Sequence, residues 1–259
     1  MIRGGLVSIS FRKLSPQEIV ALVARSRVRG LEWGGDVHVP HGDRNRAAEV
    51  AAMTRDAGLV VAAYGSYYRA GEPPGADNPD FGAVLESAIR LGAPTIRVWS
   101  GRQPSAADDE AYRSRVTADL QRIGALAAPH GITVTCEHHA HTLTDSRASA
   151  LRLYADLAAA NVQPYWQPAP ELSPSDNLAI LHDLLPRLVN AHVFHWVVTA
   201  GRRERCPLSA GSHDWSGYLQ AMAATGRTHW ALLEFVKDDR PEQFLEDAAA
   251  LDGWLAALH

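Results

Sequence analysis

The feature that most constrains the fold is an alternation of short β-branched apolar runs with longer segments of helical period. Eight such strand–helix modules share 259 residues, about 32 residues each, which is the size of a strand with its crossover helix. This alternation is typical of a parallel sheet covered by helices. The predicted strands are Gly5–Phe11, Gly30–Trp33, Leu59–Tyr64, Thr95–Trp99, Ile132–Glu137, Val162–Gln167, Leu188–Trp196 and His229–Val236.

Local signals mark several ends of the helices between these strands. Ser15, followed by Pro16 and Glu18, forms a predicted capping box, and Gly58 and Gly92 are predicted to end helices. The predicted helices are Glu18–Ser26, Asn45–Ala57, Phe81–Leu91, Glu110–Ala128, Arg147–Ala160, Ser175–Leu184, Asp214–Thr225 and Pro241–Leu258. We therefore expect an α/β fold, one (β/α)₈ TIM-barrel domain over residues 1–259. No Gly-x-Gly-x-x-Gly follows the first strand, which disfavours a dinucleotide-binding sheet.

Charge and composition limit the classes of partner that we expect this chain to bind. The formal net charge is −4 and the basic residues are dispersed, so we expect no nucleic-acid partner. No stretch approaches the roughly 20 apolar residues of a membrane span, and we expect neither a leader peptide nor a membrane contact. The two cysteines, Cys136 and Cys206, have no metal-type spacing and indicate a reducing, cytoplasmic location. Assembly into a homo-oligomer stays open.

Several predicted strands end in polar side chains, although apolar strands usually end in small neutral residues. In a barrel these ends converge on one rim, where catalytic residues lie. Glu137 and His139 are two residues apart and should point the same way in an extended chain. Glu234 lies inside the apolar run from Ala231 to Val236, where it requires a cation or a metal as partner. One alternative is a structural glutamate paired with Arg97.

A metal site is the chemistry that these residue types favour. His192 and His195 are three residues apart, so only one of them faces the barrel interior in a regular strand. We prefer His192 as the ligand and keep His195, or a purely structural histidine, as alternatives. Two carboxylates (Glu137 and Glu234), one imidazole and the amide oxygen of Gln167 form a donor set for Mn²⁺ or Mg²⁺, with Zn²⁺ or Co²⁺ less suited.

The order of motifs along the chain resembles the sugar phosphate isomerase/epimerase family, also called xylose isomerase-like TIM barrels. The resemblance runs from Gly5 to Leu258. The matching segments include Gly30-Leu31-Glu32-Trp33, Thr135-Cys136-Glu137-His138-His139, His192-Val193-Phe194-His195, Asp214-Trp215 and Leu233-Glu234-Phe235-Val236. It implies one divalent metal held by Glu137, Gln167, His192 and Glu234. The family usually has Asp where this chain has Gln167, which removes a negative charge from the site.

The expected reaction is isomerisation or epimerisation of a small ketose or other sugar-like substrate. Glu137 and Glu234 would exchange a proton next to a carbonyl, through an enediolate. Further candidates for binding the substrate are His38, Arg97, His139 and His195, the tryptophans Trp33, Trp99, Trp166 and Trp196, and the loop arginines Arg202, Arg203 and Arg205. Core packing is the alternative for each tryptophan, and a solvated loop charge is the alternative for the arginines.

Two other functions compete with this one. The same metal and base could serve a lyase or dehydratase acting on a ketosugar or cyclitol. Alternatively, the chain could be a metal-free sugar-binding barrel without catalysis, which Gln167 favours because an amide binds a cation more weakly than a carboxylate.

Overall fold

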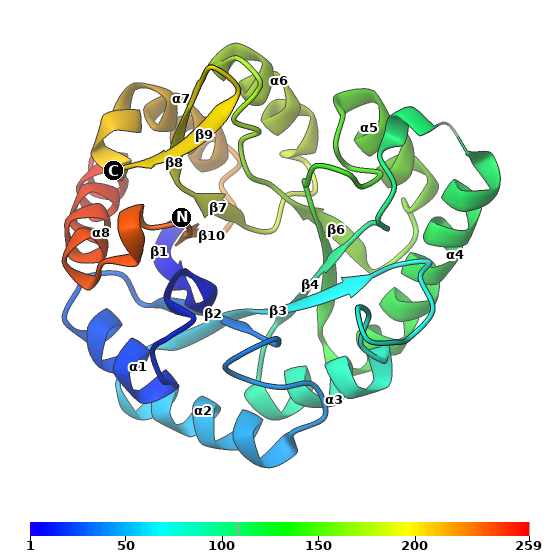
Figure 1. Ribbon diagram of the computed structural model, residues 1–259, viewed down its shortest axis with the longest axis horizontal. Coiled ribbons are helices and arrows are strands. Elements are labelled where there is room, and N and C mark those ends of the chain that lie inside the picture. The colour runs from blue at the N-terminus through cyan, green and yellow to red at the C-terminus, as the bar shows by residue number, and fades with distance from the viewer. Residues whose placement is uncertain (108, 259) are drawn as a thin grey trace. The chain divides into compact units, whose positions relative to one another are not determined.

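The computed structural model describes residues 1–107 and 109–258. Within them, eight parallel strands form one nearly closed sheet in the order β6-β5-β4-β3-β2-β1-β10-β7, and eight α-helices alternate with them along the chain (Figure 1). The predicted α/β TIM barrel is confirmed. The strands of this sheet are β1 (Ile2–Val7), β2 (Gly30–Gly34), β3 (Val60–Arg69), β4 (Thr95–Trp99), β5 (Thr133–Glu137), β6 (Val162–Tyr165), β7 (Ala191–Val193) and β10 (His229–Leu233).

Most helix ends lie where local sequence signals place them. Ser15 and Glu18 form the predicted capping box at the start of α1, with Ser15 N donating to Glu18 Oε2 at 2.7 Å. Gly58 and Gly92 have φ angles of 70° and 72°, a conformation that glycine adopts without steric cost. The helices are α1 (Pro16–Ala24), α2 (Arg44–Asp56), α3 (Phe81–Leu91), α4 (Glu110–Ala127), α5 (Arg147–Asp156), α6 (Pro174–Leu184), α7 (Ser212–Ala223) and α8 (Pro241–Ala256).

Two predicted strands end earlier than expected. The predicted bounds of the first strand, Gly5–Phe11, are wrong, because β1 ends at Val7 and a short 3₁₀ helix, Ser8–Phe11, follows it. The predicted seventh strand, Leu188–Trp196, is in fact β7 followed by an antiparallel hairpin of β8 (His195–Thr199) and β9 (Arg202–Cys206). The predicted loop arginines Arg202, Arg203 and Arg205 therefore lie in this hairpin.

The chain divides into two compact units, and its organisation as one domain stays a prediction. The first unit comprises Met1–Glu32, Met53–Val60 and the chain from Trp166 on. In it, β1 pairs with β10, and β10 pairs with β7. Apolar side chains at these paired positions, such as Leu6, Leu233 and Val193, are at most 2% exposed. The burial of these side chains is what stabilises the strands that present the polar residues at their carboxyl ends.

The second unit comprises Trp33–Ala52 and Val61–Tyr165. It contains strands β3 to β6, with α3, α4 and α5 along their outer side (Figure 1). The pairing of β3 with β4 is irregular: Gly65 pairs with Arg97 and Arg69 with Trp99, so β3 contains two extra residues in this bulge. Tyr67, within the bulge, has φ of 57°, a left-handed conformation that is costly for a residue with a bulky side chain.

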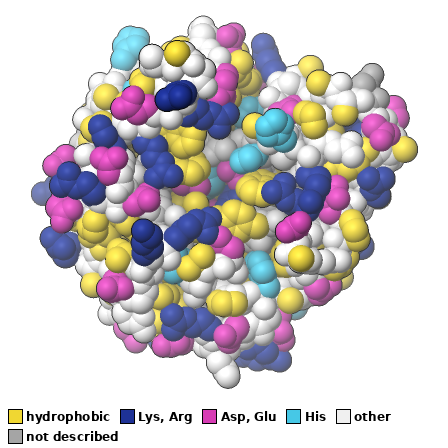
Figure 2. Space-filling view, viewed as in Figure 1, with side chains coloured by type: hydrophobic (Ala, Val, Ile, Leu, Met, Phe, Trp, Pro, Cys, Tyr) yellow, Lys and Arg dark blue, Asp and Glu magenta, His cyan; other side chains and the backbone are white. Residues whose placement is uncertain are grey.

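The surface carries both charge types. On the face shown in Figure 2, basic and acidic side chains are interspersed. Among residues 1–107 and 109–258, every helix is too short or too polar to cross a lipid bilayer.

Candidate active site

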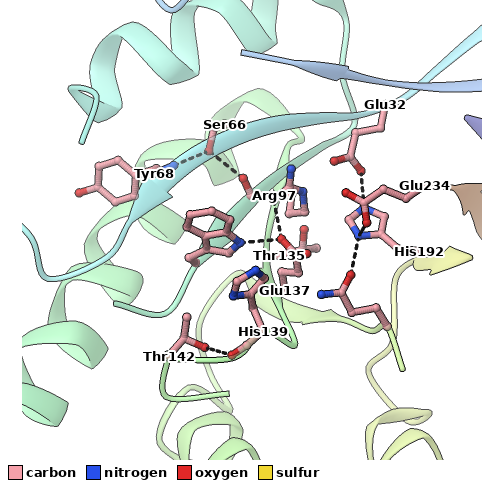
Figure 3. A network of polar contacts seen from close by, with 12 residues as sticks. Glu32, Ser66, Tyr68, Arg97, Thr135, Glu137, His139, Thr142, His192 and Glu234 are labelled. Atoms are coloured by element: carbon pink, nitrogen blue, oxygen red, sulfur yellow. Dashed lines mark hydrogen bonds and ion pairs between the residues drawn. The ribbon is translucent and has the colours of Figure 1, made fainter. Parts of the chain in front are cut away.

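A buried imidazole surrounded by oxygen atoms lies in the first unit. The His192 side chain, in β7, is 0% exposed. Its Nδ1 lies 3.2 Å from Gln167 Oε1 and 3.2 Å from Glu234 Oε2, and its Nε2 lies 3.3 Å from Glu32 Oε2. Figure 3 shows Glu32 and Glu234 pointing toward the His192 ring. Glu32 and His192 lie within β2 and β7, whereas Gln167 and Glu234 lie just beyond the carboxyl ends of β6 and β10.

The donor set fits a divalent cation. Glu234 Oε2 and Gln167 Oε1 both face His192 Nδ1, a ring nitrogen that can donate one hydrogen at most. Glu234 Oε2 contacts this nitrogen without the alignment of a hydrogen bond. Carboxylate and amide oxygens around an imidazole nitrogen are ligands that Mg²⁺, Mn²⁺ and Zn²⁺ accept. The three oxygen-bearing side chains are largely buried, at 9% exposure or less, which excludes competing water.

Glu32 is a residue that sequence reasoning left out of the site. It is 0% exposed, and its contact with His192 Nε2 holds the imidazole from the side opposite to Gln167 and Glu234. A carboxylate at the far ring nitrogen of a histidine fixes the orientation and tautomer of the imidazole. The signal in the sequence was a glutamate between apolar neighbours, Leu31 and Trp33, in a short strand.

In the second unit, a buried ion pair involves Glu137, the last residue of β5. Arg97 Nη1 lies 2.5 Å from Glu137 Oε2, and the Trp99 indole N–H donates to the same oxygen at 2.6 Å. The Arg97 and Glu137 side chains are only 2% and 5% exposed. Arg97 therefore balances the charge of Glu137, whereas the sequence-based alternative paired it with Glu234. Its role in binding a substrate stays a prediction.

Partly exposed rings surround this ion pair at the ends of three neighbouring strands. The Trp99 and His139 rings lie 4.7 Å apart, and the Tyr67 ring lies 5.4 Å from Trp99, edge to face. The predicted orientation of His139 toward the side of Glu137 agrees with this grouping (Figure 3). Trp99 and His139 thus remain candidates for contact with a substrate.

Three residues that the sequence predicts to contact the substrate are buried. Trp33 and Trp166 are 0% exposed, which favours the alternative of core packing, and their contact with a substrate stays a prediction. Trp166 packs against Trp215 and Tyr218, with ring centroids 6.0 and 5.1 Å away. His38 is 2% exposed and packs edge-on against Trp33.

The remaining predicted residues lie on the hairpin of the first unit. His195, in β8, lines a cavity of about 180 Å³ together with Trp196 and Asp214, and burial lowers the pKa of its imidazole. The structure thus places His192, and not His195, among the carboxylates. Arg205 forms an ion pair with Asp239 at 2.6 Å. Of the two other loop arginines named above, Arg203 forms an ion pair with Glu171, and Arg202 is exposed at the start of β9. The pairing of Arg205 favours a structural charge over a substrate contact.

Comparison with known proteins agrees with this architecture. Residues 20–257 match the family model of the xylose isomerase-like TIM barrel. No curated protein matches the sequence. The fold is shared with AsbF of Bacillus anthracis, a probable 3-DHS dehydratase involved in petrobactin synthesis (TM-score 0.79, 20% identity, 97% of this chain and 99% of that chain).

Two further solved structures have the same fold. One is a D-psicose 3-epimerase determined in the presence of D-fructose (TM-score 0.65, 15% identity, 98% of this chain and 97% of that chain). The other is a xylose isomerase-like TIM barrel protein from Mycobacterium smegmatis in complex with magnesium (TM-score 0.71, 15% identity, 96% of this chain and 91% of that chain). At these identities the likeness concerns the fold, whereas the family model spans most of the sequence. The chain belongs to the xylose isomerase-like TIM barrel family.

Proposed function

We propose that the protein is a divalent-metal-dependent isomerase or epimerase of a small ketose or other sugar-like substrate. The observation that carries this proposal is the His192 imidazole, fully buried among the side-chain oxygens of Gln167, Glu234 and Glu32. A cluster of this composition is costly to bury unless it binds a cation or carries out chemistry.

In this proposal Glu137, Gln167, His192 and Glu234 hold one Mn²⁺ or Mg²⁺ ion. Glu137, His192 and Glu234 are buried residues of the types that ligate metals. In a TIM barrel the carboxyl ends of all strands face one rim, which gives Glu137 at the end of β5 access to the same ion. A magnesium complex of a protein with the same fold is consistent with this choice.

In the proposed reaction each of these side chains has a separate role. A bound divalent cation would polarise the substrate carbonyl and offset the charge of an enediolate. Glu137 accepts the proton from the carbon next to the carbonyl, and Glu234 returns a proton to the opposite face or to the neighbouring carbon. Arg97 and Trp99 orient the Glu137 carboxylate through Oε2. Glu32 orients His192 through Nε2.

The test measures turnover of a panel of ketoses with and without Mn²⁺, in heavy water, by mass spectrometry and chromatography. Proton exchange at the carbon next to the carbonyl predicts an epimer or isomer that gains deuterium there. We expect Glu234→Gln to lower kcat/KM by about 10²–10⁴-fold. The matched control is Glu242→Gln, since Glu242 is an exposed glutamate at the start of α8, and it should leave kcat/KM unchanged.

Three outcomes would contradict the proposal. Full activity in Glu234→Gln would remove the acid/base assignment. A product lighter by one water would assign a lyase to the same site. Sugar binding without any metal-stimulated turnover, together with no calorimetric binding of Mn²⁺ or Mg²⁺, would assign a metal-free sugar-binding barrel.

A further inference from the structure

Arg69 is a cation beside Glu137 that the proposed reaction does not yet use. It is the last residue of β3 and is partly exposed. Its guanidinium carbon lies 4.1 Å from the centre of the Trp99 ring, and the Trp99 indole donates to Glu137 Oε2 at 2.6 Å. One indole ring therefore separates the guanidinium from the carboxylate that we assign as the base.

The bulge in β3 places Arg69 at this position, because it shifts the pairing of β3 with β4. Without the two extra residues between Gly65 and Arg69, the partner of Trp99 would be Tyr67. The bulge instead pairs Arg69 with Trp99, and it does so with Tyr67 in a left-handed conformation. Asn78 Oδ1 accepts from the Arg69 N–H at 2.7 Å and fixes the end of the strand. Backbone strain of this kind persists where the surrounding structure holds it, often at a functional site.

Arg69 lacks a counter-ion within the part of the chain that the structure describes. Among residues 1–107 and 109–258, no carboxylate forms an ion pair with its guanidinium. Glu72 and Asp77 attract it without forming an ion pair with it. Glu72 itself accepts from Tyr112 at 3.0 Å and pairs with Arg102 at 3.7 Å. Partial burial lowers the pKa of Arg69, and repulsion from Arg102 lowers it further. An anion at this position would add an attraction that offsets the repulsion from Arg102.

We propose that Arg69, stacked on Trp99, binds an oxyanion of the substrate, so that the substrate class is an anionic sugar: a sugar acid or a sugar phosphate. A planar guanidinium pairs with carboxylate and phosphate through two parallel hydrogen bonds. The rings of Trp99, Tyr67 and His139 supply an apolar surface for the carbon skeleton between the anion and Glu137. This inference rests on the proposed function, because it takes Glu137 as the reacting carboxylate.

The experiment compares three probes by isothermal titration calorimetry: ribitol (neutral), D-ribonate (carboxylate) and D-ribose 5-phosphate (phosphate). We expect the wild type to bind at least one anionic probe about 10–100-fold more tightly than ribitol, and to lose this preference in Arg69→Gln. Arg69→Lys keeps the charge without the planar fork and should retain part of the preference. The ratio of ribonate to ribose 5-phosphate affinity distinguishes the two sources of the oxyanion.

A matched control is available in the chain. Arg3 lies over the Trp230 ring at 5.8 Å, in the same kind of stacking, but near the amino end of β1. Arg3→Gln should keep the anion preference. Equal wild-type affinity for ribitol and both anionic probes, or an unchanged preference in Arg69→Gln, would overturn the proposal.

The two proposals fail in different ways. Metal-dependent turnover of neutral ketoses, with the same kcat/KM in wild type and Arg69→Gln, would refute the anion site and leave the reaction standing. Conversely, anion binding that is lost in Arg69→Gln, from a protein that turns over no sugar, would support the anion site and refute the reaction.

Discussion

The buried pair of Arg97 and Glu137 allows a quantitative test of the candidate site. Both side chains are at most 5% exposed, and their charged atoms lie 2.5 Å apart. Arg97→Gln leaves a carboxylate in the interior without the cation that balances it, which costs about 3–5 kcal/mol in comparable buried pairs. The Trp99 indole still donates to the carboxylate, so we expect the lower end, about 3 kcal/mol.

A second substitution separates the lost charge from lost packing. In the double variant Arg97→Gln/Glu137→Gln, the uncompensated charge is gone and two neutral amides face each other. We therefore expect the double variant to be more stable than Arg97→Gln by about 1–3 kcal/mol. If the loss came from packing alone, the second substitution would add to it.

Urea denaturation with a constant m value measures these free energies of unfolding. The matched control is Arg152→Gln, because the charged atoms of Arg152 and Glu110 lie a similar 2.6 Å apart but their side chains are 49% and 62% exposed. Solvent screens such a pair, so its loss should leave the urea midpoint nearly unchanged. Equal midpoint shifts for Arg97→Gln and Arg152→Gln, or a double variant less stable than Arg97→Gln, would refute the reasoning.

Three further predictions concern single residues. Burial lowers the pKa of His138 to about 4, so the folded chain keeps this imidazole neutral while the unfolded chain binds a proton below the ordinary value of 6.5. The free energy of unfolding should fall as the pH drops from about 6.5 toward 4, by about 2 kcal/mol at pH ~5. A His138→Gln variant whose free energy of unfolding falls with pH as steeply as that of the wild type would contradict this. Trp166→Ala should cost about 3–5 kcal/mol in urea denaturation, because its ring is fully buried, and a loss below roughly 1 kcal/mol would argue for an exposed site. Glu32→Gln should weaken Mn²⁺ binding in calorimetry by about 10–100-fold with an unchanged circular dichroism spectrum, whereas wild-type affinity would exclude an orienting role.

Much of the fold follows from short-range sequence signals. The period of the apolar residues and helix caps such as Ser15 and Gly92 depend on residues a few positions apart. They can therefore be recognised without knowledge of the tertiary contacts. The wrong predictions of strand ends lie where contacts with distant segments determine the local structure. Phe11 looks like the end of a strand, but it belongs to a 3₁₀ helix and packs against Phe244, 6.1 Å away in α8. No glycine or proline marks the end of β7 at Val193, so the hairpin that follows was missed.

The candidate site divides in the same way. The sequence predicts polar residues at strand ends, because a carboxylate or imidazole in an apolar run is conspicuous, and it led to Glu137, His192 and Glu234. Which side chains contact one another depends on register and on where each strand ends. Hence Arg97 is the partner of Glu137, and Glu32 contacts His192 across 160 positions in sequence.

By itself, the sequence determined the eightfold alternation, most helix ends and the kinds of polar group at the strand ends, because each depends on residues close together in the chain. Only the tertiary structure decided the buried or exposed state of each tryptophan, the hairpin after β7 and the bulge that pairs Arg69 with Trp99. The physical reason is that burial, strand register and ion pairing depend on contacts between distant segments, which no local pattern of residue types encodes.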